Sequence, residues 1–346
     1  MRLLIEAANA SVAIENGRIV EPGGTFDRLI RSSGEVRPGL INAHDHLHLN
    51  HYGRLGMPPY ANAREWARDI QSRYAATIAR GRLMSRRHAL LAGAWKNLLA
   101  GVTHVVHHDS WEPDFADFFP IKVVRIANAD SITLNPLFRP PVDATYAMHV
   151  AEGVDDTSGA EIPALDARGL LNNNLLAVHA VGADGGGIAS LRACGCAIVW
   201  CPTSNQFLFG RSAPPALLAE GVDVLLGSDS LLTGAGTILD ELRVARGHIS
   251  DRRLLDAVGD PAARRLGMPP PSLEPGAPAD VVLFRRSVLE ADPEDVLLVS
   301  VDGQLRVLDP GLVPLLPIEG GQTVTWRGVT RWISGPAGPV VLSEPG

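Results

Sequence analysis

The sequence predicts an α/β protein built around a (β/α) barrel, with a small sheet domain formed by both chain ends. In the central part, short apolar runs alternate with helix-forming stretches, which is typical of a parallel sheet covered on both faces. Both ends instead carry strand-like sequence with many turn residues. The length of 346 residues suits one barrel-sized domain and a smaller one.

The chain ends are predicted to be β-structure. Residues 11–20 are strand-like on either side of Asn16-Gly17, which is typical of two strands joined by a tight turn. Strand-like sequence returns near the other end, at residues 279–284, 298–303 and 340–342.

These patterns predict a division of the chain into three segments. We expect residues 1–37 and residues 269–346 to form one small β domain together. Residues 38–268 would then form the barrel between them.

The central segment begins with a predicted strand at residues 40–46. Residues 61–100 carry apolar side chains at helical spacing, and Gly101 ends this stretch. Further apolar runs predict buried strands at residues 102–108, 121–126, 145–150, 175–179, 197–200 and 222–229. Helix-forming sequence lies between several of them, at residues 189–194, 215–220 and 238–248.

Composition excludes several classes of function. The formal net charge of −7 argues against a nucleic-acid partner, because phosphate binding needs a basic face. No apolar run is long enough to span a membrane, and Glu6 interrupts the N-terminus too early for a secretory signal. The 3 cysteines all fall between Cys194 and Cys201 and give no disulfide framework, so we expect a cytoplasmic protein.

The first predicted central strand ends in His44-Asp45-His46. Alternate side chains of a strand point to the same face, so His44 and His46 would project together. Neutral imidazole is a common ligand of zinc and iron. Two ordinary polar residues in a loop would give the same pattern, so the pair alone does not establish a metal site.

Further polar residues fall at the carboxyl ends of the predicted strands, where active sites of barrels lie. Histidines with a purely structural role in the core, each bonded to a neighbouring group, could lie at any position along a strand. The residues at strand ends are His44, His46, His107, His108, His149, His179 and Asp229.

One divalent metal ion, Zn²⁺ or Fe²⁺, suits this set. His44, His46, His149 and Asp229 would supply three nitrogens and a carboxylate and leave a position open for water. Such a metal lowers the pKa of its water from roughly 15.7 to about 7. For Asp229, an ordinary helix-capping or turn role is the alternative.

Three residues are candidate catalytic groups. Asp229 could accept the proton of the water, and Glu152, just past the strand that carries His149, could move a proton to the leaving group. His179 could hydrogen-bond a developing oxyanion or hold the attacking water. The alternatives are a solvated loop carboxylate for Glu152 and a supporting or packing role for His179.

These residues resemble the amidohydrolase superfamily, in the branch of metal-dependent hydrolases that contains the cytosine and guanine deaminases and the triazine chlorohydrolases. The resembling motifs follow one another at residues 38–46, 101–103, 149–152, 179–181, 201–205, 226–230 and 273–280. The resemblance implies a distorted (β/α)8 TIM-like barrel with a small β-sandwich made from both chain ends. It also implies one Zn²⁺ or Fe²⁺ held by His44, His46, His149 and Asp229, with Glu152 and His179 catalytic.

The chain departs from the family pattern in two places. Residues 126–145 are too few for a helix, a further strand and another helix, so one βα unit is expected to be reduced or missing. The binuclear branch needs a bridging lysine near the end of a middle strand. Lys122 stands at a strand start instead, which favours a single metal ion.

Substrate contacts are assigned to His107, His108, Arg54 and Asn205. Adjacent residues of a strand face opposite sides, so only one of His107 and His108 can face the barrel interior, and strand parity leaves that choice open.

The expected activity is hydrolytic deamination of a nitrogen heterocycle, a small molecule. Hydrolysis of another C–N bond or of a C–halogen bond is the alternative reaction, and a non-catalytic metal-binding relative is the alternative class. A barrel with scattered histidines and no bound metal is a third possibility. Barrels of this family often associate into homo-oligomers, but the sequence leaves the oligomeric state open.

Overall fold

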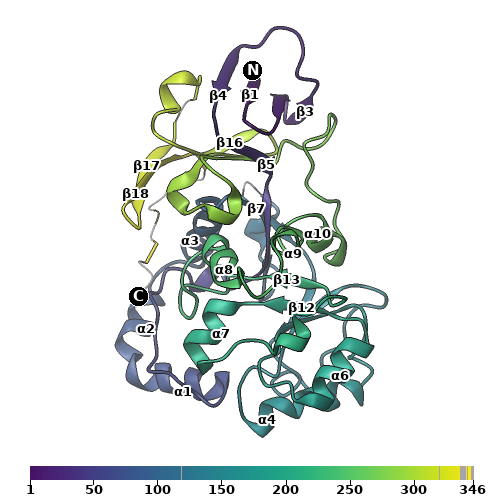
Figure 1. Ribbon diagram of the computed structural model, residues 1–346. Helices are drawn as coiled ribbons and strands as arrows, with labels where there is room; N and C mark the ends of the chain where they lie inside the picture. Colours follow the sequence, from purple (N-terminus) through teal and green to yellow (C-terminus); the bar gives the residue numbers. More distant parts are fainter. Residues whose placement is uncertain (118, 319, 336–339, 341, 344–346) are drawn as a thin grey trace.

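The computed structural model describes residues 1–117, 119–318, 320–335, 340 and 342–343. Strands from both chain ends lie together at the top of Figure 1, and the central segment with its helices lies below them. Strands of the N-terminal and C-terminal segments are therefore neighbours in space although the whole central segment separates them in sequence.

The N-terminal strands form a four-stranded sheet in the order β3-β2-β1-β4. Its members are β1 (Arg2–Glu6), β2 (Ser11–Glu15), β3 (Arg18–Val20) and β4 (Arg28–Arg31). The predicted turn at Asn16-Gly17 joins β2 to β3, and both of its residues have positive φ, 50° and 80°. Glycine and asparagine tolerate this conformation best, which explains their place in the turn.

A six-stranded sheet joins the two chain ends in the order β17-β18-β16-β15-β14-β5. It contains β5 (Glu35–Pro38), β14 (Val281–Phe284), β15 (Val296–Val301), β16 (Gln304–Leu308), β17 (Gln322–Trp326) and β18 (Val329–Ile333). Buried apolar side chains of both sheets, among them Leu3, Ile5, Val281 and Leu298, form one hydrophobic cluster. Burial of this shared core holds the chain ends together.

The strand predicted at residues 340–342 is not found. Val340 and Leu342 lie outside the strands, and residue 341 lies outside the described residues. The predicted strands at residues 279–284 and 298–303 correspond to β14 and β15.

The central strands form two parallel sheets, one of three strands in the order β6-β7-β8 and one of five in the order β13-β12-β11-β10-β9. Their bounds are β6 (Leu40–Asp45), β7 (Val102–His107), β8 (Lys122–Val124), β9 (Ala127–Ala129), β10 (Tyr146–Val150), β11 (Leu175–His179), β12 (Ala197–Trp200) and β13 (Val224–Leu226). The predicted α/β class with parallel sheets is confirmed.

Strands β8 and β9 are two halves of one extended segment. Only Arg125 and Ile126 separate them, and the first half pairs with β7 whereas the second pairs with β10. The segment therefore occupies one strand position and links the two sheets. This leaves seven strand positions, one βα unit fewer than in a (β/α)8 barrel, and residues 125–145, all described, contain no helix.

The helices follow the predicted stretches closely in the first half of the central segment. They are α1 (Ala63–Arg73), α2 (Ala75–Gly81), α3 (Arg86–Leu98), α4 (Asp156–Gly159), α5 (Glu161–Asp166), α6 (Gly185–Ala193), α7 (Pro202–Phe209), α8 (Ile238–Ala245), α9 (Asp251–Asp256) and α10 (Asp260–Arg265), with 3₁₀ turns such as η1 (Leu47–Leu49) and η3 (Pro215–Leu217). Among the described residues, no helix has the length and apolar character needed to cross a membrane.

Helix α3 packs directly against η1, the turn that follows His44 and His46. Ser85 caps the helix by accepting a hydrogen bond from the backbone N–H of His88, and Ala89 to Leu98 are buried. A Cβ added at Gly93 would lie 2.4 Å from the carbonyl oxygen of Leu47. The absence of a side chain at Gly93 therefore allows the backbones of α3 and η1 to approach closely.

We expect Gly93→Ala to destabilise the protein by about 1–3 kcal/mol, because overpacking of a tight contact forces the backbone apart. The measurement is the midpoint of urea unfolding. Gly185→Ala is the matched control, because an added Cβ there meets nothing within 4 Å and φ is not positive. Equal midpoints for the two variants would contradict the role given to Gly93.

Candidate metal centre

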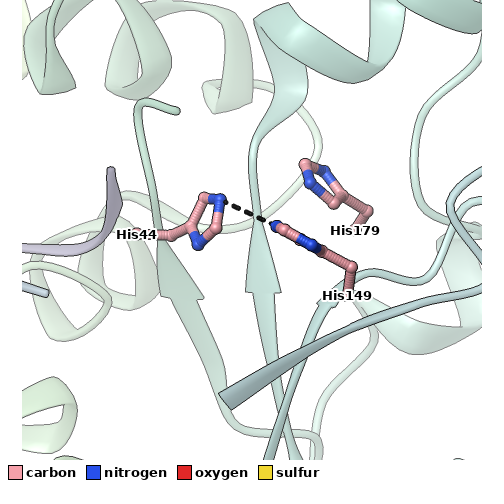
Figure 2. A group of neighbouring side chains, drawn as sticks. All are labelled: His44, His149 and His179. Carbon is pink, nitrogen blue, oxygen red and sulfur yellow. Dashed lines mark hydrogen bonds between the residues drawn. The ribbon is translucent and has the colours of Figure 1, made fainter. Parts of the chain in front are cut away.

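Three imidazoles converge where the central strands end. His44 belongs to β6, His149 belongs to β10, and His179 is the last residue of β11. Figure 2 shows their rings turned toward one another. His46 follows β6 directly, and Asp229 comes shortly after β13, so all five side chains lie at the carboxyl ends of parallel strands.

The distances between the donor atoms fit a metal ligand set. The Nε2 atoms of His44 and His149 are 3.4 Å apart. The Oδ1 atom of Asp229 lies 3.9 Å from Nε2 of His44 and 3.9 Å from Nε2 of His46. Two ligands of one tetrahedral zinc ion, each at about 2.1 Å, are roughly 3.4 Å apart. His44, His46 and Asp229 form one of the groups that could hold an ion, and His44, His149 and His179 form another that shares His44.

Burial favours the neutral form of His44 and His149. It lowers the pKa of His44 and of His149 well below the ordinary value, and the neighbouring imidazoles lower both pKa values further. A neutral imidazole has a free lone pair, which is the form that binds a metal.

Asp229 is held so that one oxygen faces the histidines. Its Oδ2 accepts hydrogen bonds from Ser204 Oγ at 2.7 Å and from Thr233 Oγ1 at 3.0 Å. Burial alone would raise its pKa. His46, His179 and the hydrogen bonds from Ser204 and from the backbone N–H of Ser230 outweigh burial and lower the pKa. The carboxylate is therefore ionised, and its Oδ1 remains directed at His44 and His46.

His179 and Glu152 form a pair beside these ligand atoms. The Nδ1–H of His179 donates to Oδ1 of Asn205 at 2.7 Å, which leaves the lone pair on Nε2. That Nε2 lies 3.5 Å from Oε1 of Glu152. Burial raises the pKa of Glu152 well above its usual value, and the charge of Asp229 raises it further. A protonated Glu152 can donate a proton, and His179 can accept one.

Four residues at these strand ends adopt left-handed backbone conformations. The φ values are 49° for Ala151, 71° for His179, 52° for Ala180 and 52° for Asp229. Such φ values are strained for residues other than glycine and persist only where surrounding bonds impose them. Here the backbone N–H of Asp229 donates to the carbonyl oxygen of His44 at 3.1 Å, and that of Ala180 donates to Val150 at 2.9 Å.

A cavity of about 230 Å³ opens onto this group. The candidate site residues that line it are His46, His149, Glu152, His179 and Asp229, and other lining residues include Leu49, Arg64, Trp66, Asp130 and Leu134. A small-molecule ligand in this cavity would touch both the ligand set and the Glu152–His179 pair.

The two adjacent histidines at the end of β7, His107 within the strand and His108 just after it, have different surroundings. His108 stacks on His149 with ring centroids 4.1 Å apart, and its Nε2 is 3.0 Å from the carbonyl oxygen of Ala129. His107 accepts a hydrogen bond at Nδ1 from the backbone N–H of Leu47, so its Nε2 carries the hydrogen and has no lone pair for a metal. Neither is among the residues that line the 230 Å³ cavity; His107 lines another cavity, of about 610 Å³ beside β8 and β9.

The other sequence-predicted substrate contacts also lie outside the cavity lining. Arg54 stacks over the ring of Phe207 at 4.7 Å and donates to the carbonyl oxygen of Gly234 at 3.0 Å. Asn205 is fully buried and contacts His179 instead. Lys122 binds Asp280 and Asp302, both at 2.7 Å, in the C-terminal segment. It therefore does not act as a bridging ligand.

Sequence reasoning missed three residues that contribute to the site. Arg64 and Asp130 line the cavity, and Asp130 follows β9, a strand half that was not predicted. Lys96 is fully buried beneath Asp229. Lys96-Asn97 interrupts an otherwise apolar helical run from Ala89 to Ala100, and that interruption could have identified it.

Comparisons with known proteins show what the chain resembles in sequence and in fold. No family model matches the chain. An aminodeoxyfutalosine deaminase of Deinococcus radiodurans is 34% identical over 116 residues, which is 32% of this chain and 28% of the relative. Among solved structures, a zinc-bound adenosine deaminase from Xanthomonas campestris has a TM-score of 0.66 and 18% identity, with 92% of this chain and 94% of that chain covered. The zinc complex of an atrazine chlorohydrolase from Arthrobacter aurescens has a TM-score of 0.65 and 18% identity, with 88% and 94% covered.

The chain shares the fold of these solved deaminase and chlorohydrolase structures. The resemblance seen in the sequence motifs is therefore confirmed for the fold. The local match to the deaminase spans 28% of that relative's length, so the activity is treated below as a proposal.

We expect the purified protein to bind one zinc ion per chain, and removal of that ion to lower the melting temperature by roughly 5–10 °C, because a ligand that binds only the folded state stabilises it. The measurement is elemental analysis together with thermal unfolding before and after chelation. His149→Ala should lose the stoichiometric zinc. A chelator that leaves both zinc content and melting temperature unchanged would contradict the assignment.

Proposed function

We propose that the protein is a metal-dependent hydrolase that deaminates a nitrogen heterocycle. The observation that carries this proposal is one cavity lined by Glu152, by His179 and by three of the four proposed ligands, His46, His149 and Asp229. Binding a metal alone requires neither a protonated carboxyl nor an oriented imidazole beside it. The known activities of the deaminase and the chlorohydrolase named above support the same class of chemistry.

Zn²⁺ is the metal that the donor set and the zinc-bound structural relatives favour, and Fe²⁺ suits the same ligands. His44, His46, His149 and Asp229 would hold it. When bound, such an ion makes water nucleophilic at neutral pH.

The protein's own side chains then control the protons. Glu152 is protonated in the resting site and can donate its proton to a ring nitrogen of the substrate, which makes the adjacent carbon more electrophilic. The ionised Asp229 can accept a proton from the attacking water. Glu152, once deprotonated, can take the proton of the newly added hydroxyl group and pass it to the leaving amine, which departs as ammonia as the carbonyl forms. The proton held by Asp229 then restores Glu152.

His179 orients the reacting groups. Asn205 fixes its ring, and its Nε2 faces Glu152 across 3.5 Å. In this position His179 can hold the attacking water by accepting a hydrogen bond, or it can bind a developing oxyanion if it becomes protonated.

We further infer that the two parallel sheets close into one barrel and that the two sheets of the chain ends form a β-sandwich. The hydrogen bond from Asp229 N–H to the carbonyl oxygen of His44 supports the first inference, because it ties the end of β13 to β6. The hydrophobic cluster shared by both terminal sheets supports the second. The domain limits 1–37, 38–268 and 269–346 and a cytoplasmic location belong to the same proposal.

The most direct functional experiment is a screen of the zinc-loaded protein for ammonia release from purines, pyrimidines, pterins and triazines. Turnover of at least one class is expected. Chloride release from a chlorotriazine without ammonia release from any compound would favour the chlorohydrolase alternative.

We expect Glu152→Gln to lower kcat by about 10²–10⁴-fold, because the amide cannot shuttle a proton. The zinc content should stay at the wild-type level, since Glu152 is not among the proposed ligands. Steady-state kinetics on the substrate found in the screen and elemental analysis measure the two effects. Retained turnover would contradict the catalytic role, and the protein would then be better described as a metal-binding relative.

A further inference from the structure

A buried lysine joins the two separate parts of the candidate metal centre. Lys96, on α3, has 0% of its surface exposed. Its ammonium group lies 2.9 Å from Oδ2 of Asp45 and donates to Ser228 Oγ at 3.0 Å and to the carbonyl oxygen of Asp229 at 2.6 Å. An ammonium group has three N–H donors, and three acceptors surround it.

The acceptors of Lys96 are placed next to the proposed ligands. Asp45 stands between His44 and His46 in the sequence, and the Asp229 carbonyl belongs to the residue whose side chain is the fourth ligand. One ammonium group therefore contacts β6 at its histidine pair and the segment after β13 at its aspartate. These two segments are distant in sequence, and Lys96 adds a side-chain link to the backbone hydrogen bond from Asp229 N–H to the carbonyl oxygen of His44.

Three amide side chains complete this buried polar network. Asn97 donates to Oδ2 of Asp45 at 2.6 Å, and Asn50 donates to Oδ1 of Asp45 at 2.9 Å. Asn42 donates to Ser228 Oγ at 2.7 Å and accepts from Ser228 N–H at 3.0 Å. Both oxygens of Asp45 are thus bonded, and the carboxylate cannot turn toward the metal centre.

We propose that Lys96 is a positioning residue that sets the affinity of the metal centre. The proposal rests on the metal site described under the proposed function. A buried ion pair is a weak source of stability compared with apolar residues of similar size, so stability alone does not explain a lysine here. Supporting bonds of this kind hold ligands in the geometry that the metal requires.

The test is the zinc affinity of Lys96→Met, measured by competition with a chromophoric chelator. Methionine has a similar length but no charge and no donors. We expect the dissociation constant for zinc to rise by about 10- to 100-fold. Leu91→Ala is the matched control, since Leu91 is a buried residue of the same helix that packs in the hydrophobic core. It should lower the unfolding midpoint and leave zinc affinity within about twofold of the wild type.

A double variant separates positioning from general destabilisation. Lys96→Met leaves Asp45 without its ion-pair partner, whereas Lys96→Met combined with Asp45→Asn removes both charges. We expect the double variant to regain stability in the metal-free form and to keep the weakened zinc affinity, because no ammonium group then bridges residue 45 and the Asp229 carbonyl. If Lys96→Met does not fold, the dissociation constant of the double variant for zinc tests the proposal.

Wild-type zinc affinity in Lys96→Met or in the double variant would overturn the proposal. So would an equal loss of affinity in Leu91→Ala, because the effect would then follow from destabilisation. These outcomes differ from failure of the proposed function, in which the wild-type protein itself binds no stoichiometric zinc.

Discussion

The geometry of the site depends on the contact between the end of β6 and the segment after β13. These segments supply His44, His46 and Asp229, and the backbone N–H of Asp229 donates to the carbonyl oxygen of His44 at 3.1 Å. The contact brings a carboxylate oxygen within 3.9 Å of two imidazoles. His149 adds a third nitrogen from β10, which belongs to the same five-stranded sheet as β13. The cavity, the Glu152–His179 pair and the proposed chemistry all require this convergence.

The convergence requires an arrangement that the chain would not adopt in isolation. Asp229 and His179 have left-handed φ values, and several neutral imidazoles are buried beside one another. Surrounding hydrogen bonds compensate for this: Ser204 and Thr233 hold the side chain of Asp229, and Asn205 holds the ring of His179. The ammonium group of Lys96 donates a hydrogen bond to the backbone carbonyl oxygen of Asp229. Strain at the site is thus balanced by a polar network that is almost wholly buried.

Much of the fold and of the candidate site could be predicted from the sequence, because the site residues lie at the ends of strands. The apolar runs located β10, β11 and β12 to within one residue, and the polar residues that ended those runs or followed them led to His149, Glu152 and His179. The fused β8–β9 segment was harder to predict, since an extended segment that changes partners halfway has no local signal. Lys96 also escaped prediction: its partners lie in other segments, and only the fold brings them together.

Seven strand positions in place of the eight of a (β/α)8 barrel change the surroundings of the candidate site. The segment from β8 to β9 connects the two sheets directly, and the chain between Arg125 and Thr145 adds no helix. Asp130, just after β9, lies in this short connection and lines the cavity. Any substrate preference would therefore depend on residues for which a complete barrel gives little guidance.

The most direct test of the central claim is a crystal structure of the zinc-loaded protein with anomalous diffraction measured at the zinc edge. One anomalous peak is expected, about 2.0–2.2 Å from Nε2 of His44, His46 and His149 and from Oδ1 of Asp229. A peak bound elsewhere on the chain, or these four side chains pointing away from a common centre, would contradict the claim.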